Sequence, residues 1–174
     1  MSEAPAIAEI PDAEAALAAL AAKMRDAVAH DAAFVGVYSG GAWLAERLAA
    51  ILPGDHRVGY IDVSYYRDDY AKSGLKGGAK RTELGFDVDG ATIVLIDDVL
   101  YTGRSVRAAI NELFDFGRPE RIELAVLVDR GGRELPIQPD YVGVRLAVAR
   151  DLSIELSKDP GGLLSLAVEP RSGN

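Results

Sequence analysis

The sequence contains no cysteine, only two histidines and one tryptophan, and no apolar run long enough to span a membrane. Without cysteine the chain can form no disulfide, and it has neither a thiolate metal site nor a cysteine nucleophile. This composition fits a reducing compartment, and we expect a cytoplasmic protein with no membrane partner. The two histidines, His30 and His56, lie outside the motifs described below, and we expect them to be ordinary surface residues.

Acidic residues outnumber basic ones, with 27 Asp and Glu against 19 Lys and Arg. The 174 residues carry a formal net charge of −8, whereas binding of a nucleic-acid backbone requires a basic face. The length is typical of a single domain and is sufficient to bury a core. The alanine-rich segment 13–29 begins with acids rather than a basic region, and Lys23 and Arg25 interrupt it. It therefore predicts an amphipathic helix with Asp12 as N-cap, not a signal peptide.

Strand-like and helix-like segments alternate along the chain. The strand patterns lie at 33–38, 58–65, 91–97 and 122–128, and the helical patterns at 43–52 and 105–116. This alternation predicts an α/β fold with a central, mainly parallel sheet flanked by helices. We expect one domain over residues 1–174, with a core at 33–130 and a small C-terminal region at 131–174 that is rich in turns.

The most informative motif is the run over residues 92–105. Its four aliphatic residues predict a strand buried on both faces, with Asp97 and Asp98 at the carboxyl end, where open α/β sheets bind ligands. The chain then turns into a helix, whose free N–H groups form an anion site with the hydroxyls of Thr102 and Ser105. Because carboxylates accept hydrogen bonds from vicinal hydroxyls, the motif predicts a site for a sugar phosphate.

A simpler interpretation of this motif stays open. An aspartate after a strand is often only a helix N-cap, and Gly103 is then only a turn residue. The second carboxylate argues against this, because it adds repulsion and desolvation with no capping role left to fill. We expect Gly117 to end the helix in a left-handed cap. The apolar face of this helix is formed by Val106, Ile110, Leu113 and Phe114.

Two further segments indicate an anionic ligand. The small residues of 36–41 let backbone amides approach an anion, although a plain glycine-rich turn is an equal alternative. The long polar segment 66–82 predicts a flexible basic lid, the alternative being a merely solvated loop. Residues 74–81 approach a Walker A motif, but Ala79 replaces the second glycine and Arg81 the Ser or Thr, so we reject a nucleoside triphosphatase. The basic residues of the predicted lid are Lys72, Lys76, Lys80 and Arg81.

These motifs carry a resemblance to a known family. The run Ile96-Asp97-Asp98-Val99-Leu100-Tyr101-Thr102-Gly103-Arg104 resembles the phosphoribosyl-pyrophosphate loop of the type I phosphoribosyltransferases. Together with 61–69, 106–109, 117–119 and 124–137, it is similar to the PyrR family, pyrimidine-operon attenuation regulators that are also uracil phosphoribosyltransferases. The resemblance covers residues 34–148. It implies a type I phosphoribosyltransferase fold and the synthesis of UMP and pyrophosphate from uracil and phosphoribosyl pyrophosphate.

The resemblance also implies residue roles. Asp97 and Asp98 orient the ribose, and Arg67 is a further catalytic residue. A hood over residues 129–137 recognises the base through backbone groups. Magnesium is expected to be held mainly by the substrate, without direct ligands from protein side chains. The ribose 5-phosphate loop comprises Asp97, Asp98, Val99, Leu100, Tyr101, Thr102, Gly103, Arg104 and Ser105, and the hood begins with Asp129, Arg130 and Gly131.

The predicted pyrophosphate loop departs from the family pattern. Many relatives have an arginine on each side of a threonine here, whereas this sequence has Tyr38, Ser39, Gly40 and Gly41. We therefore expect backbone groups, magnesium, and Arg67 or a lid lysine to hold the pyrophosphate.

The resemblance implies two macromolecular partners: the pyrimidine leader mRNA, and further copies of the chain in a dimer or higher homo-oligomer. The net charge of −8 leaves RNA binding open. Scattered arginines either form a local basic patch or solvate the surface; these are Arg107, Arg118, Arg121, Arg133 and Arg145. Two other functions also stay open: a nucleotide-sensing regulator with little turnover, and a salvage phosphoribosyltransferase for another base.

Overall fold

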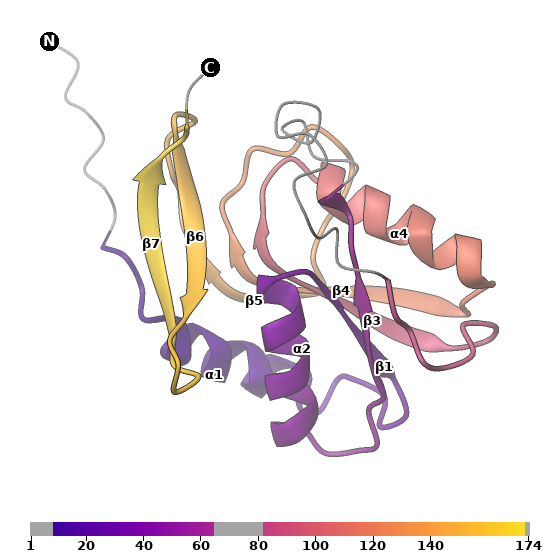
Figure 1. Ribbon diagram of the computed structural model, residues 1–174. Helices are drawn as coiled ribbons and strands as arrows, with labels where there is room; N and C mark the ends of the chain where they lie inside the picture. The colour runs from indigo at the N-terminus through magenta and orange to yellow at the C-terminus, as the bar shows by residue number, and fades with distance from the viewer. Residues whose placement is uncertain (1–8, 65–81, 173–174) are drawn as a thin grey trace, which may run out of the picture.

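The computed structural model describes residues 9–64 and 82–172, which form a five-stranded parallel sheet, three helices and a separate two-stranded antiparallel hairpin (Figure 1). The strand order of the sheet is β2-β1-β3-β4-β5. This confirms the predicted α/β class. The elements are α1 (Ala13–Met24), β1 (Ala33–Val37), α2 (Gly40–Ile51), β2 (Val58–Ile61), β3 (Thr92–Leu100), α4 (Arg104–Phe116), β4 (Arg121–Asp129), β5 (Tyr141–Arg145), β6 (Leu152–Lys158) and β7 (Leu164–Pro170).

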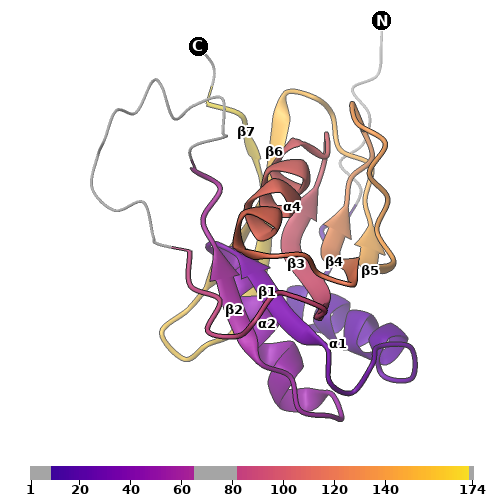
Figure 2. The same ribbon diagram turned by 90° about the vertical axis from the view of Figure 1, so that its right-hand side faces the viewer.

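The central strands are buried on both faces, and alternate side chains enter two separate cores. In β3, Val94 and Ile96 pack with α1 and α2, whereas Ile93 and Leu95 pack with α4. Figure 2 shows α4 on the face of the sheet opposite to α1 and α2. The sheet is therefore covered on both sides, as the nearly continuous apolar strands predicted.

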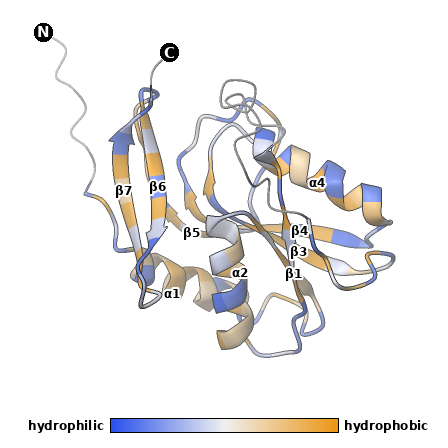
Figure 3. Ribbon diagram, viewed as in Figure 1, coloured by the Kyte–Doolittle hydropathy of each residue, from blue (hydrophilic) through white to orange (hydrophobic). Residues whose placement is uncertain are grey.

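Helix α4 has an apolar face toward the sheet and a polar face toward solvent, visible as alternating colours in Figure 3. Val106 and Leu113 are buried, as their spacing predicted, whereas Phe114 is exposed. Gly117 does not adopt the predicted left-handed cap, because its φ is +156° and its ψ −167°. Glycine is needed there for another reason: a Cβ would lie 2.7 Å from Asp89 Oδ1, which accepts a hydrogen bond from the Arg118 N–H.

Helix α1 begins where predicted, since the Asp12 carboxylate accepts a hydrogen bond from the Glu14 N–H. It ends at Met24 rather than at residue 29, because the chain turns and buries Val28 in the core. Glu14 also ties three elements together. Its carboxylate forms a two-pronged ion pair with Arg47 of α2 and accepts a hydrogen bond from the Leu164 N–H of β7.

Other boundaries also differ from the sequence patterns. Helix α2 begins three residues before the predicted position 43, because Gly40 and Gly41 belong to its first turn. Strand β2 ends at Ile61, and the predicted strand end at residue 65 lies outside the described residues. His56 is more than an ordinary surface residue: its ring stacks on Phe34, and its Nδ1 and Nε2 lie 2.7 and 2.9 Å from the carbonyl oxygens of Ala32 and Pro53. Across 9–64 and 82–172, no helix is long and apolar enough to cross a membrane.

Candidate functional site

The strand order creates a topological switch point between β1 and β3. From β1 the chain crosses to β2 through α2, and from β3 it crosses to β4 on the other side through α4. The loops that follow β1 and β3 therefore diverge to opposite faces of the sheet. Open α/β sheets bind ligands in the crevice that such a switch point leaves at the carboxyl ends of the strands. The predicted sugar-phosphate motif and pyrophosphate loop lie at this crevice.

Asp97 and Asp98 lie within β3 rather than at its end. The ladder with β1 stops at the pair Gly36 and Ile96, but the ladder with β4 continues to Leu100. The two acids thus extend beyond β1 while β4 still supports them. The Asp97 carboxylate accepts a hydrogen bond from the Asp98 N–H at 2.8 Å, and the Asp98 carboxylate accepts one from the Val99 N–H at 2.8 Å. Neither acid is the N-cap of α4, which is Gly103, so the capping interpretation is wrong.

The turn from β1 into α2 packs directly against these acids and has room only for glycine at two positions. A Cβ at Gly40 would lie 2.5 Å from Asp98 Oδ2, and one at Gly41 would collide with the Ile96 carbonyl. Ser39 precedes the helix without a side-chain capping bond among the described residues, and the Tyr38–Ser39 peptide is cis. In the first helical turn the Ala42 N–H donates to the Ser39 carbonyl at 3.2 Å, whereas the N–H groups of Gly40 and Gly41 have no intrahelical acceptor. The predicted pyrophosphate loop therefore presents backbone donors beside Asp98.

The turn into α4 presents a second set of donors. Gly103, the N-cap of α4, is in the left-handed region with φ +95° and has no side chain to cap the helix. The Thr102 hydroxyl accepts a hydrogen bond from the Arg104 N–H at 3.2 Å, which leaves its own proton free to donate. Since the first N–H groups of a helix lack intrahelical acceptors, those of Ser105 and Val106 are also available to an anion.

The hood, residues 129–137, lies over this turn. The Glu134 and Leu135 N–H groups donate to the Thr102 carbonyl at 2.9 and 3.2 Å. The Arg104 side chain pairs with Glu134 at 2.9 Å. A Cβ on Gly103 would lie 3.0 Å from the Ile137 side chain. The hood and the 5-phosphate loop are therefore packed together, although about thirty residues separate them in the sequence.

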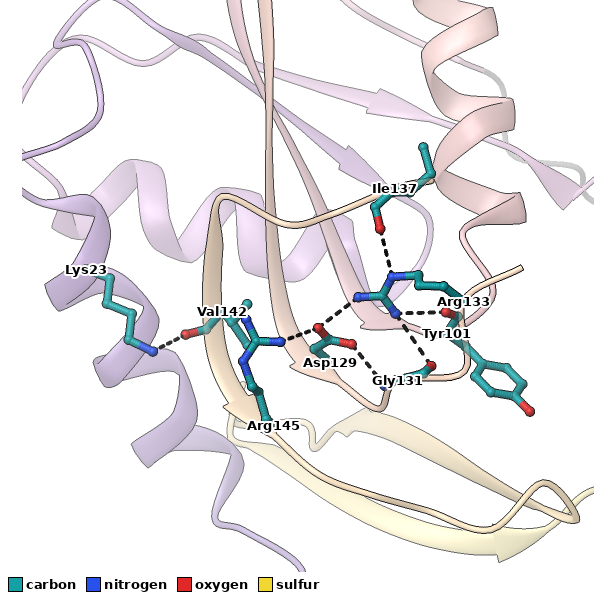
Figure 4. Close-up of polar contacts among 8 residues, drawn as sticks. All are labelled: Lys23, Tyr101, Asp129, Gly131, Arg133, Ile137, Val142 and Arg145. Atoms are coloured by element: carbon teal, nitrogen blue, oxygen red, sulfur yellow. Dashed lines mark hydrogen bonds and ion pairs between the residues drawn. The ribbon is translucent and has the colours of Figure 1, made fainter. Parts of the chain in front are cut away.

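Asp129, at the end of β4, is a buried junction of the hood. Its carboxylate accepts hydrogen bonds from the Gly131 N–H at 3.0 Å and from Arg145 at 2.7 Å, and it pairs with Arg133 at 2.8 Å (Figure 4). Burial raises the pKa of Asp129, but the Gly131 N–H and the two guanidinium groups outweigh it and leave the pKa below its usual value. The carboxylate is thus ionised and fully engaged within the protein.

Arg130 turns from the hood toward the C-terminal hairpin. It is buried, and its guanidinium donates to the carbonyls of Leu152 and Ala149 at 2.8 and 3.0 Å. Burial lowers its pKa. The guanidinium lies 4.0 Å from the centre of the Tyr101 ring, and Arg171, just after β7, lies 4.8 Å from the same ring. The hairpin therefore reaches the 5-phosphate loop.

Several predicted residues cannot be placed. Arg67 and the four basic residues of the predicted lid, Lys72, Lys76, Lys80 and Arg81, lie outside the described residues. Of the five scattered arginines, Arg133 and Arg145 pair with Asp129, and Arg121 pairs with Glu123. Within the described part of the chain, Arg107 and Arg118 make no ion pair. Arg133 lies four residues after Asp129, but this segment is not helical, so the spacing did not predict their ion pair.

Comparison with known proteins identifies the family of the chain. The model of the phosphoribosyl transferase domain matches residues 4–154. Two solved phosphoribosyltransferases share the fold. The hypoxanthine-guanine enzyme of Bacillus anthracis has a TM-score of 0.63 and 16% identity, covering 84% of this chain and 86% of its own. The hypoxanthine enzyme of Staphylococcus aureus has a TM-score of 0.62 and 19% identity, covering 84% of this chain and 80% of its own. The fold and the matched domain define a type I phosphoribosyltransferase.

The sequence relatives are more specific. The bifunctional protein PyrR of Ralstonia nicotianae is 52% identical over 87% of this chain and 88% of its own length. That of Pseudomonas paraeruginosa is 47% identical over 71% and 72%, and that of Roseiflexus is 48% identical over 80% and 79%. The chain belongs to the PyrR family, pyrimidine operon regulators with uracil phosphoribosyltransferase activity, and this confirms the family that its motifs predicted.

Proposed function

We propose that the crevice between β1 and β3 is the active site, where uracil N1 displaces pyrophosphate from the anomeric carbon of phosphoribosyl pyrophosphate with inversion. One observation carries this proposal: the start of α2 packs against Asp98 of β3, and β3 leads through a short turn into the start of α4. A sugar that carries a phosphate at one end and a pyrophosphate at the other matches this arrangement, because carboxylates accept hydrogen bonds from hydroxyls and helix starts bind anions. UMP is then the nucleotide product.

Asp97 and Asp98 orient the ribose by accepting hydrogen bonds from its vicinal hydroxyls. The 5-phosphate binds the turn into α4, where the N–H groups of Ser105 and Val106 and the Thr102 hydroxyl donate to it. The remaining residues of the loop, Val99 to Arg104, supply the backbone of this turn. Gly103 allows this turn, because it adopts a left-handed conformation that glycine reaches without strain.

The pyrophosphate binds the turn 38–41 at the start of α2. This turn contains no arginine, so backbone N–H groups supply the contacts from the described residues. Arg67 and the basic lid residues are proposed to neutralise the remaining charge. The transition state separates a positive sugar from a negative leaving group, and charges already in place stabilise it most effectively. The two carboxylates stabilise the positive charge on the sugar, and the helix start stabilises the negative charge on the departing pyrophosphate.

Magnesium fits this site, because Mg²⁺ prefers hard oxygen ligands and the two carboxylates stand beside the place of the ribose hydroxyls. The substrate is proposed to hold it through the pyrophosphate and ribose oxygens, and when bound it supplies charge neutralisation for the leaving group. Among residues 9–64 and 82–172, no group of three or more His, Asp or Glu side chains could hold a metal ion.

Backbone groups of the hood are proposed to recognise the base. The side chain of Asp129 is engaged with two arginines and the Gly131 N–H, and that of Arg130 with the Ala149 carbonyl between β5 and β6. Both side chains are therefore occupied by contacts within the protein. This supports recognition of the base through the main chain of the residues that follow.

Release of pyrophosphate from phosphoribosyl pyrophosphate and magnesium tests this proposal. Uracil, hypoxanthine, guanine and orotate are compared as acceptors, with wild type and the double variant Asp97→Asn/Asp98→Asn. We expect turnover with uracil alone, abolished in the double variant. Asp115→Asn, which neutralises an exposed acid of α4, is the matched control and should retain activity. Turnover with a purine would indicate a different salvage enzyme, and full activity of the double variant would exclude these acids.

The regulatory partner is proposed to be the pyrimidine leader mRNA, and the assembly a homo-oligomer. Filter binding of the leader hairpin with and without UMP tests the first, and light scattering of the purified protein tests the second. UMP-dependent RNA binding supports the regulator. Tight UMP binding without turnover would instead identify a sensor that lacks transferase activity.

A further inference from the structure

Arg133 connects three separate parts of the proposed active site. Its Nη2 pairs with Asp129 at the end of β4 at 2.8 Å, and its Nη1 donates to the Tyr101 carbonyl of the 5-phosphate loop at 2.8 Å. Its Nε donates to the Ile137 carbonyl at the far end of the hood, also at 2.8 Å. Figure 4 shows the guanidinium at the centre of these acceptors. The side chain is 15% exposed, so solvent competes little for these contacts.

The geometry of these contacts is specific to arginine. A guanidinium is planar and presents its donors in a rigid fork, so three acceptors bound to Nε, Nη1 and Nη2 are fixed relative to one another. A lysine ammonium could stay beside Asp129, but as a compact charge on a flexible stem it cannot hold all three at these angles. Together with the bonds from the Glu134 and Leu135 N–H groups to the Thr102 carbonyl, the fork sets the distance between the hood and the 5-phosphate loop.

We propose that Arg133 is a positioning residue for the transferase reaction: it holds the hood at the spacing from the 5-phosphate loop that brings the base to the anomeric carbon. The inference rests on the proposed function, since it assumes that the hood binds the base and the loop the phosphate. A displacement of about 1 Å between two bound reactants can lower the rate about 100-fold. A residue that spans both binding segments is placed to control that distance.

Arg145 provides an internal comparison. It binds the same Asp129 Oδ2 as Arg133, at 2.7 Å, and its side chain is 68% exposed. Among the described residues it makes no hydrogen bond to the 5-phosphate loop or to residues 130–137. If Asp129 needed only a positive neighbour, substitutions of the two arginines would have similar effects. If the fork positions the hood, only Arg133 should matter for turnover.

The experiment compares Arg133→Lys and Arg133→Met with Arg145→Lys and Arg145→Met. For each variant, kcat and KM for uracil are measured, together with the Kd of phosphoribosyl pyrophosphate by calorimetry and the melting temperature. For Arg133→Lys we expect uracil turnover, as kcat/KM, to fall about 10- to 100-fold. We expect its affinity for phosphoribosyl pyrophosphate to change less than about threefold, because the acids and the helix starts are unchanged. Both Arg145 variants should stay within about twofold of wild type.

The outcomes separate this inference from the proposed function. The positioning role alone would be overturned if Arg133→Lys kept wild-type turnover, or if Arg145→Lys lost as much turnover as Arg133→Lys. A parallel loss of uracil turnover and phosphoribosyl pyrophosphate affinity would indicate a general collapse of the site and would also overturn it. Absence of wild-type turnover with uracil would overturn the proposed function and this inference with it. If Arg133→Met fails to fold, Arg133→Lys decides, because it keeps the cation beside Asp129.

Discussion

Replacing Gly40 with alanine tests whether the packing of α2 against Asp98 sets the geometry of the site. The added Cβ would lie 2.5 Å from Oδ2 and 2.9 Å from both Cβ and Cγ of Asp98. Carbon atoms in favourable contact are about 3.5–4.0 Å apart. The Asp98 side chain must therefore rotate, or the turn must move away from β3.

The effects on stability and on activity should differ in size. Alanine in a helix is favoured over glycine by up to about 1 kcal/mol, whereas overpacking costs about 1–3 kcal/mol. We therefore expect the free energy of unfolding to fall by about 0–2 kcal/mol. The loss in kcat/KM should be larger, because moving a group that positions the substrate by about 1 Å can lower the rate about 100-fold. That factor corresponds to about 2.7 kcal/mol of transition-state stabilisation.

Pyrophosphate release gives kcat/KM for this variant, and urea unfolding gives its stability. Gly161→Ala is the matched control, because the new Cβ would meet only Asp159 Oδ1, at an ordinary 3.4 Å. The control should retain both activity and stability. A folded Gly40→Ala protein with wild-type kcat/KM would refute the assignment of Asp98 to the ribose site.

Three further predictions concern stability and titration. Asp129→Asn should lower the free energy of unfolding by about 1.5–3 kcal/mol at pH 7. Since the folded pKa of Asp129 is lowered, its contribution to stability is present above the unfolded pKa of about 3.9 and is lost as the pH falls through the folded pKa. Urea unfolding should therefore show the difference in stability between variant and wild type becoming smaller in acid. Leu20→Ala, in the fully buried face of α1, should cost about 2–5 kcal/mol in urea unfolding, whereas Leu163→Ala, at an exposed turn, should cost less than about 0.5. The hydrogen bond to Glu46 raises the pKa of Tyr60 to about 12, so Glu46→Gln should shift one tyrosine in an ultraviolet titration toward its ordinary value of about 10, and an unchanged titration would contradict this cause.

The fold was predictable because its signals are local. The apolar run of β3 and the helical spacing of Val106 and Leu113 are properties of short segments, and they indicated a buried parallel sheet covered by helices. The two acids of β3 could be identified for the same reason, since adjacent carboxylates after an apolar strand are unusual. The strand ends could not be predicted, because the end of β3 depends on β4 continuing beside it after β1 has stopped.

The internal contacts of the site depend on the tertiary fold. Nothing in the sequence near Tyr101 indicates that Arg133 binds its carbonyl or that Arg130 and Arg171 lie beside its ring. The glycines 40 and 41 suggested backbone access for an anion, but the structure shows that they also admit the carboxylate of Asp98 and the carbonyl of Ile96. Such roles require knowledge of which segments meet.

Two of the three contacts through which Arg133 holds the hood are with main-chain oxygens. The carbonyls of Tyr101 and Ile137 are present whatever side chains these positions carry. Side chains at 134–136 can therefore be varied without removing an acceptor from the fork. Such changes should leave the preference for uracil unchanged, because both the spacing of the hood and its proposed contacts with the base belong to the main chain.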